Sequence, residues 1–134
     1  DIEDIQVEKY RRKEPVSLKL VYADDIDYAY KYSDRSILDR LLSLRGSCDD
    51  ILIVKNGLLS DSYSANVVLS DGRAWHTPDS PLLPGTMRAS LLEKGKIVER
   101  RITEDMIRNY TEIRLINALN DLEEATRIST TRIE

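Results

Sequence analysis

Two residues in the middle of the chain, Asn56 and Gly57, constrain its fold more than any other pair. They follow the β-branched run over residues 50–55 and precede the apolar start of residues 58–61. Asn-Gly between two such segments is the strongest short signal for a two-residue hairpin, because both turn positions must take positive φ. The sequence therefore predicts a strand, a tight turn and a returning strand over residues 50–61.

A second hairpin signal follows closely. Asp71-Gly72 separates the segment over residues 65–69 from a strand-like segment that runs through residues 75–77, and Asp-Gly is a common turn between strands. Residues 5–10 and 17–22 also alternate apolar and polar side chains, as half-buried strands do. The middle of the chain is thus predicted to be a largely antiparallel meander.

Two helices are expected beside these strands. The first has an apolar stripe at three- and four-residue spacing, formed by Ile37, Leu38, Leu41 and Leu42. Gly46 is a suitable end for it, and Gly85 and Gly95 mark the start and the end of the second helix. Further on, residues 97–102 favour a strand and residues 112–119 a strand or buried run. For the tail over residues 123–134, a helix and a frayed end both remain open.

Charge and composition exclude several functions. A net charge of −4 over 134 residues argues against a nucleic-acid-binding surface, and no apolar run approaches the roughly 18 residues that a membrane span needs. Cys48 is the only cysteine, so an intramolecular disulfide is impossible and a reducing compartment is the simpler assumption. A single histidine gives no support to a metal site. We therefore expect one cytoplasmic domain without nucleic-acid, membrane or metal partners.

Lys31 is the candidate chemical centre. It lies between Tyr30 and Tyr32, just before the first helix. Partial removal from water disfavours the ammonium form and lowers the pKa of a lysine toward that of a nucleophilic amine, which can form a Schiff base. The ordinary alternative is a lysine that lays its methylenes on the two rings and keeps its charge in water.

Three further segments carry candidate binding groups. Asp61 lies among small residues at the end of a predicted strand, where a turn aspartate is the ordinary alternative. Gly85 permits close backbone approach, and the N–H groups of Thr86 and Met87 would face an anion at a helix start, although plain helix initiation explains the same pattern. Asn117 is one amide in an apolar run and needs hydrogen-bond partners if buried.

In their order and spelling these segments resemble the fold-type IV pyridoxal-phosphate (PLP) enzymes, or class IV aminotransferases, which include branched-chain and D-amino-acid aminotransferases and aminodeoxychorismate lyase. The resemblance covers residues 17–122. Tyr-Lys-x-x-Asp-Arg over residues 30–35 is similar to the family's Lys-x-x-Asn box. Gly-Thr-Met-Arg over residues 85–88 is similar to Gly-Ile-x-Arg, and Asn-Ala-Leu over residues 117–119 is similar to a run in the lyase.

The resemblance implies a role for each segment. Lys31 would hold PLP as a Schiff base and, once displaced by an amino substrate, would move a proton as a free amine. Asp61 stands where the family has a glutamate that pairs with the pyridinium nitrogen, and it is one methylene shorter. The other implied cofactor contacts lie near the phosphate: Gly85, Thr86, Met87, Asn117 and Ala118. Tyr30, Tyr32 and Tyr63 are further candidates to line the site.

The resemblance also implies an architecture and an activity. The fold would be of the mixed α/β (α+β) class, an antiparallel meander or pseudo-barrel with flanking helices. Residues 1–16 would lead in from an N-terminal domain that this chain lacks, residues 17–122 would form the PLP-binding large domain, and residues 123–134 a tail. We expect a homodimer that acts as an aminotransferase on an amino acid and a keto acid; aminodeoxychorismate lyase and a truncated non-catalytic relative are the alternatives.

Overall fold

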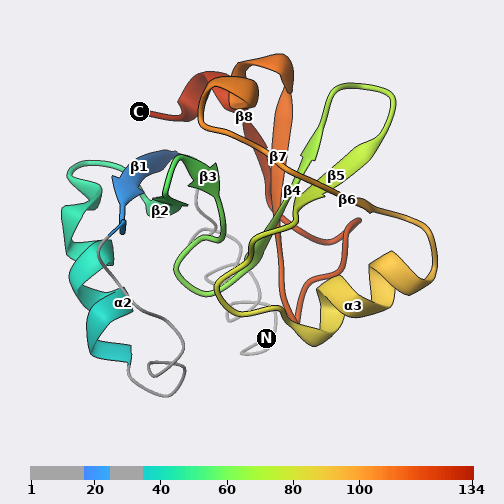
Figure 1. Cartoon of the computed structure of the whole chain (residues 1–134), viewed down its shortest axis with the longest axis horizontal. Helices are drawn as coiled ribbons and strands as arrows, with labels where there is room; N and C mark the ends of the chain where they lie inside the picture. The colour runs from blue at the N-terminus through green and yellow to red at the C-terminus, as the bar shows by residue number, and fades with distance from the viewer. Residues whose placement is uncertain (1–16, 25–34) are drawn as a thin grey trace, which may run out of the picture.

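The structure, a computed structural model, describes residues 17–24 and 35–134, and it consists of two sheets with two helices (Figure 1). The smaller sheet has the order β1-β2-β3, with β1 (Leu18–Tyr22), β2 (Asp50–Lys55) and β3 (Leu58–Leu59). The larger has the order β6-β5-β4-β7-β8, with β4 (Asn66–Ser70), β5 (Trp75–Pro78), β6 (Val98–Arg100), β7 (Glu112–Ile116) and β8 (Arg127–Ser129). The helices are α2 (Arg35–Leu42) and α3 (Thr86–Glu93), and short 3-10 turns cover Ser43–Arg45, Asp105–Asn109 and Thr130–Arg132.

The connections decide the direction of each strand pair. Asn56 and Gly57 have φ values of 53° and 78°, so the predicted tight turn is confirmed and β2 and β3 are antiparallel. The Asp71-Gly72 turn likewise joins antiparallel β4 and β5. In contrast, β1 and β2 are parallel with α2 between them in the sequence, and β5 and β6 are parallel with α3 between them. The mixed α+β class is confirmed: both sheets are mixed, and most of their strand pairs are antiparallel.

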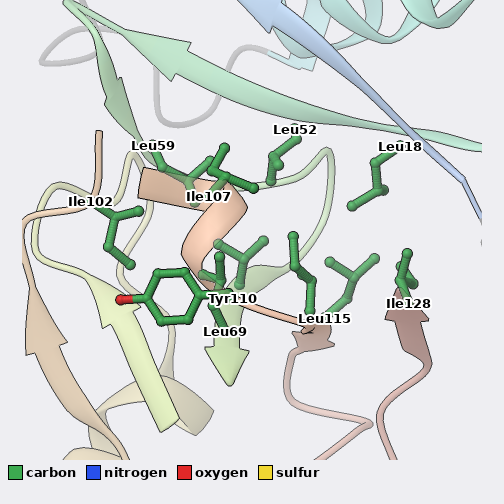
Figure 2. Close-up of a cluster of buried hydrophobic side chains, with 11 residues drawn as sticks. Leu18, Leu52, Leu59, Leu69, Ile102, Ile107, Tyr110, Leu115 and Ile128 are labelled. Atoms are coloured by element: carbon green, nitrogen blue, oxygen red, sulfur yellow. The ribbon is translucent and has the colours of Figure 1, made fainter. Parts of the chain in front are cut away.

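The largest apolar cluster lies between the two sheets (Figure 2). Leu18, Leu52 and Leu59 reach it from the smaller sheet, and Leu69 and Ile113 from the larger one, all at 0% exposure. Because successive strand side chains point to opposite faces, the neighbours of these residues are left for the outer faces. Apolar residues therefore form three clusters, one between the two sheets and one on the outer face of each sheet.

Each helix covers one of the outer faces. Leu38 and Leu41 of α2 pack with Ile51 and Ile53 of β2, which explains why β2 is buried along its whole middle. Leu91 of α3 packs in a third cluster with residues of the larger sheet, of the connection between α3 and β6 and of the segment that follows β7: Val68, Ile97, Ile116, Leu122 and Ala125. Among the described residues no helix is long and apolar enough to cross a membrane.

The ends of the helices follow the glycines, whereas the tail does not follow its prediction. Gly95, with a φ of 72°, stands just beyond α3 as expected, whereas Gly46, with a φ of 61°, ends the 3-10 turn Ser43–Arg45 that continues α2. Residues 127–129 form β8, which pairs with β7, so neither a helix nor a frayed end describes the tail. The strand predicted over residues 5–10 lies outside the described residues.

Candidate functional site

A cavity of about 240 Å³ opens between α2, α3 and the ends of β3 and β7. Its walls come from four separate parts of the chain. These are the start of α2, the connection over residues 61–66, the loop and helix start over residues 82–87, and the turn after β7 over residues 116–118. The cavity thus lies where the two sheets and both helices meet.

The first wall, the connection over residues 61–66, contains the carboxylate of Asp61, which is 5% exposed. Its Oδ2 accepts hydrogen bonds from the backbone N–H groups of Leu82 (2.8 Å) and Leu83 (3.0 Å), and its Oδ1 accepts one from Nδ2 of Asn66 (2.7 Å). Burial raises the pKa of Asp61 because it disfavours the charged form, although these three donors act in the opposite direction. A carboxylate offers about four acceptor positions, so Oδ1 keeps one for a further donor.

Asn66 connects Asp61 to the loop that precedes α3. Its Nδ2 also donates to the carbonyl of Leu83 (2.9 Å), and its Oδ1 accepts from the N–H of Gly85 (2.9 Å). A Cβ at position 85 would stand 2.9 Å from that same oxygen. The group that lies close to Gly85 is therefore the Asn66 side chain.

The amino end of α3 forms a second wall. Gly85 is its N-cap, and no side chain caps the helix. The first N–H groups of a helix have no intrahelical partner and carry partial positive charge. Thr86 and Met87, which line the cavity, supply these groups. An anionic group is the ligand that such a helix end prefers.

The turn after β7 forms a third wall, and it is stabilised from within. Oδ1 of Asn117 accepts from the N–H of Leu119 (2.9 Å) and the N–H of Asn120 (3.1 Å), while the backbones of Asn117 and Asn120 bond reciprocally. The side chain of Asn117 thus holds the turn together. The turn meets the cavity at Asn117 and Ala118.

The fourth wall belongs to α2 and carries a positive charge. Arg35, the first residue of α2, lines the cavity and holds its guanidinium carbon 4.5 Å from the centre of the Tyr63 ring. The hydroxyl of Tyr63 donates to Oδ1 of Asp39, one helical turn after Arg35. Tyr63 is the one described member of the three tyrosines proposed to line the site.

The structure brings together every described residue that the sequence singled out for binding. Six residues from three distant segments line the one cavity: Asp61, Gly85, Thr86, Met87, Asn117 and Ala118. Lys31, Tyr30 and Tyr32 lie outside the described residues. Sequence reasoning missed Arg35 and Leu38 as wall residues and did not assign Asn66 its connecting role. The signal for Arg35 was its place in the Lys-x-x-Asp-Arg segment, and the signal for Asn66 was its five-residue spacing from Asp61.

Comparison with known proteins identifies the family. The family model for class IV amino-transferases matches residues 32–128, and the chain belongs to this family of PLP-dependent enzymes. An uncharacterized protein of Haemophilus influenzae is 48% identical over 118 residues, which are 88% of this chain and 63% of that protein. The chain therefore spans less than two thirds of the length of this relative.

Two solved structures share the fold, and the more similar of the two supports the same assignment. A Haemophilus somnus protein provisionally named a 4-amino-4-deoxychorismate lyase is 44% identical with a TM-score of 0.75, covering 81% of this chain and 56% of that one. A hypothetical aminotransferase from Mycobacterium tuberculosis in its PLP-bound form is 18% identical with a TM-score of 0.67, covering 96% of this chain and 52% of that one. At this identity the second structure shows the shared fold alone.

Proposed function

We propose that the protein is a PLP enzyme of the aminotransferase type that acts on an amino acid, with Lys31 as the attachment point of the cofactor. One observation carries the proposal: an acid group, a free helix amino end and a backbone turn from three distant segments line one cavity. When bound, PLP supplies an electron-withdrawing ring that makes a proton on the substrate's Cα easier to remove. The residues around the cavity have to bind that ring, orient it and carry the proton.

Asp61 fits the ring nitrogen. The acceptor position left on Oδ1 would receive the N–H of a protonated pyridine, while the bonds from Leu82 and Leu83 hold Oδ2 in place. A buried carboxylate with a positive partner is favoured in its charged form, so Asp61 would keep the ring nitrogen protonated. The two backbone donors make its orientation independent of whether a ligand is present.

The amino end of α3 fits the phosphate. Thr86 and Met87 would donate their backbone N–H groups, and Gly85 lets the loop lie close against Asn66. The backbone at Asn117 and Ala118 would contact the phosphate or the substrate's carboxylate from the opposite wall. The Nζ of Lys31 would take the proton from Cα and return it at the neighbouring carbon of the cofactor.

Aminodeoxychorismate lyase is the second candidate, and the 44% identity to the Haemophilus somnus protein of that provisional name favours it. A non-catalytic relative is the third candidate, and the cofactor test described next decides it. We also propose a homodimer, which sedimentation of the purified protein would test, and a cytoplasmic location, which fractionation of cells would test.

Absorption spectroscopy tests the cofactor, and product analysis separates the activities. The intact protein with added PLP should show a visible band that is absent from Lys31→Ala, and borohydride should fix the cofactor in the wild type only. A colourless wild type would favour the non-catalytic relative, and a borohydride-fixed adduct in Lys31→Ala would disprove the role of the lysine. An aminotransferase needs a keto-acid acceptor for turnover, whereas the lyase releases pyruvate without one.

A further inference from the structure

The positive charge that Arg35 brings to the cavity has no assigned use in the function proposed above. Its side chain lines the same cavity as Asp61 and the start of α3. The ion pairs formed between described residues, Arg88 with Glu99 and Arg114 with Glu112, do not include it. The N–H groups of the Arg35 guanidinium can therefore donate to a ligand in the cavity.

Tyr63 fixes the place of this guanidinium. The ring centre lies 4.5 Å from the guanidinium carbon, which is within the range of a cation–π contact. Such a contact uses the charge of the group and the face of the ring, so the N–H donors at the guanidinium edge stay available. Arg35 is exposed, and without the ring its long side chain would sample many rotamers.

Asp39 in turn fixes Tyr63. It accepts the tyrosine hydroxyl hydrogen bond from a position four residues after Arg35, on the same face of α2. A phenol that donates to a carboxylate gains electron density in its ring, which strengthens the attraction for a cation above it. Arg35, Tyr63 and Asp39 thus form one preorganised unit anchored to a single helix.

The charge distribution in the cavity determines which ligand group fits Arg35. The described lining contains one carboxylate, Asp61, and three of its acceptor positions are occupied by Asn66, Leu82 and Leu83. The phosphate of the proposed cofactor has its own donors at the amino end of α3. An arginine edge matches a carboxylate in shape and charge, because two parallel N–H groups meet two oxygens.

We propose that Arg35, held over Tyr63, is the receptor for a carboxylate of the substrate. This inference rests on the proposed function for the position of the cofactor, but the carboxylate site itself rests on the cavity and on the Arg35–Tyr63–Asp39 unit. The carboxylate has two possible sources in an amino acid or keto acid: the group on Cα and a second group on the side chain. Both present the same chemistry to Arg35.

Calorimetric titration with three probes of similar size tests the inference: glutarate, butyrate and neutral glutaramide. Each probe is titrated into the intact protein with and without added PLP. In Arg35→Gln the dissociation constant of the carboxylate should rise roughly 10- to 100-fold, because a charge-assisted bond is lost. Turnover separates the two sources: Arg35→Gln should lower kcat/KM for neutral and acidic amino acids alike if Arg35 binds the group on Cα, and for acidic amino acids alone if it binds a side-chain carboxylate.

Matched variants separate recognition from structure. Arg40→Gln removes an exposed arginine from the same helix outside the cavity lining and should leave all three dissociation constants within twofold. Tyr63→Leu removes the ring and should weaken carboxylate binding in the same direction as Arg35→Gln, while glutaramide binding stays constant. Added salt should weaken carboxylate binding to the wild type more than to Arg35→Gln.

The inference is overturned if the wild type binds the two carboxylates no better than glutaramide, or if Arg35→Gln binds them within twofold of the wild type. These outcomes are independent of the cofactor proposal. A protein that turns yellow with PLP but shows unchanged carboxylate binding in Arg35→Gln refutes the role of Arg35 alone. A wild type that stays colourless refutes the proposed function, and the titration without PLP still decides the role of Arg35.

Discussion

The space beside Gly85, which the Asn66 side chain fills, gives a prediction whose magnitude can be worked from the structure. In Gly85→Ala, the new methyl group would stand 2.9 Å from Oδ1 of Asn66, where ordinary contacts begin near 3.4 Å. Residue 85 has a φ of −86°, which alanine adopts freely, so the backbone adds no strain. The whole cost therefore comes from the displacement of the Asn66 side chain by about half an ångström.

The magnitude follows from the bonds that Asn66 would lose. Its side chain is buried and makes three hydrogen bonds, to Asp61, to the carbonyl of Leu83 and from the N–H of Gly85. Each buried hydrogen bond contributes about 1 kcal/mol net. We expect Gly85→Ala to lower the free energy of unfolding by about 1 to 3 kcal/mol, depending on how many of the three bonds survive.

A double-mutant cycle measured by urea unfolding isolates this contact. Asn66→Ala removes the oxygen, so adding Gly85→Ala to that variant should cost less than about 0.5 kcal/mol. Gly95→Ala is the control: it has open space and a φ of 72°, so it should cost about 1 kcal/mol in both backgrounds. An equal cost of Gly85→Ala with and without Asn66 would refute the steric reasoning.

Two further predictions concern titratable groups. Burial and the charge of Arg100 lower the pKa of His76, the only histidine, so the unfolded chain takes up a proton before the folded one does. The contribution of His76 to the free energy of unfolding should therefore be fully present above about pH 6.5 and be lost as the pH falls through the lower pKa of the folded state. In His76→Gln the urea midpoint should decline less steeply over this pH range, and an unchanged slope would contradict the prediction. Asp61→Asn keeps the side-chain shape and should retain the visible PLP band while turnover falls roughly 100-fold, whereas turnover within threefold of the wild type would contradict a role at the ring nitrogen.

Local signals predicted the turns and helix ends because each depends on the backbone freedom of one or two residues. Asn56-Gly57 and Gly46 are examples, since positive φ is required at each. The parallel pairs were not predicted, although each has a helix between its strands, and a helix is the usual crossover for parallel neighbours. Residues 127–129 contain one buried apolar residue, Ile128, which is too little for a strand signal.

The candidate site divides in the same way. Residue types with an unusual chemical property, such as Asp61 and Gly85, were found from the sequence. The donors that hold Asp61 are the backbone N–H groups of Leu82 and Leu83. Every residue except proline has such a group, so the sequence does not reveal which of them bind a side chain. The stacking of Arg35 on Tyr63 joins residues 28 positions apart and depends on how α2 packs, which no local pattern encodes.

The cavity is walled on one side by α2, which covers the three-stranded sheet, and on the other by α3, which covers the five-stranded sheet. A molecule that fills it contacts both the three-stranded sheet with α2 and the five-stranded sheet with α3, and so links these two halves of the structure. By mass action such a molecule raises the resistance of both halves to unfolding together, by about 2.7 kcal/mol when its concentration is a hundred times its dissociation constant. For the same reason, a substitution that weakens the packing between the two halves should raise the dissociation constant of the ligand, even when the substituted residue is far from the cavity.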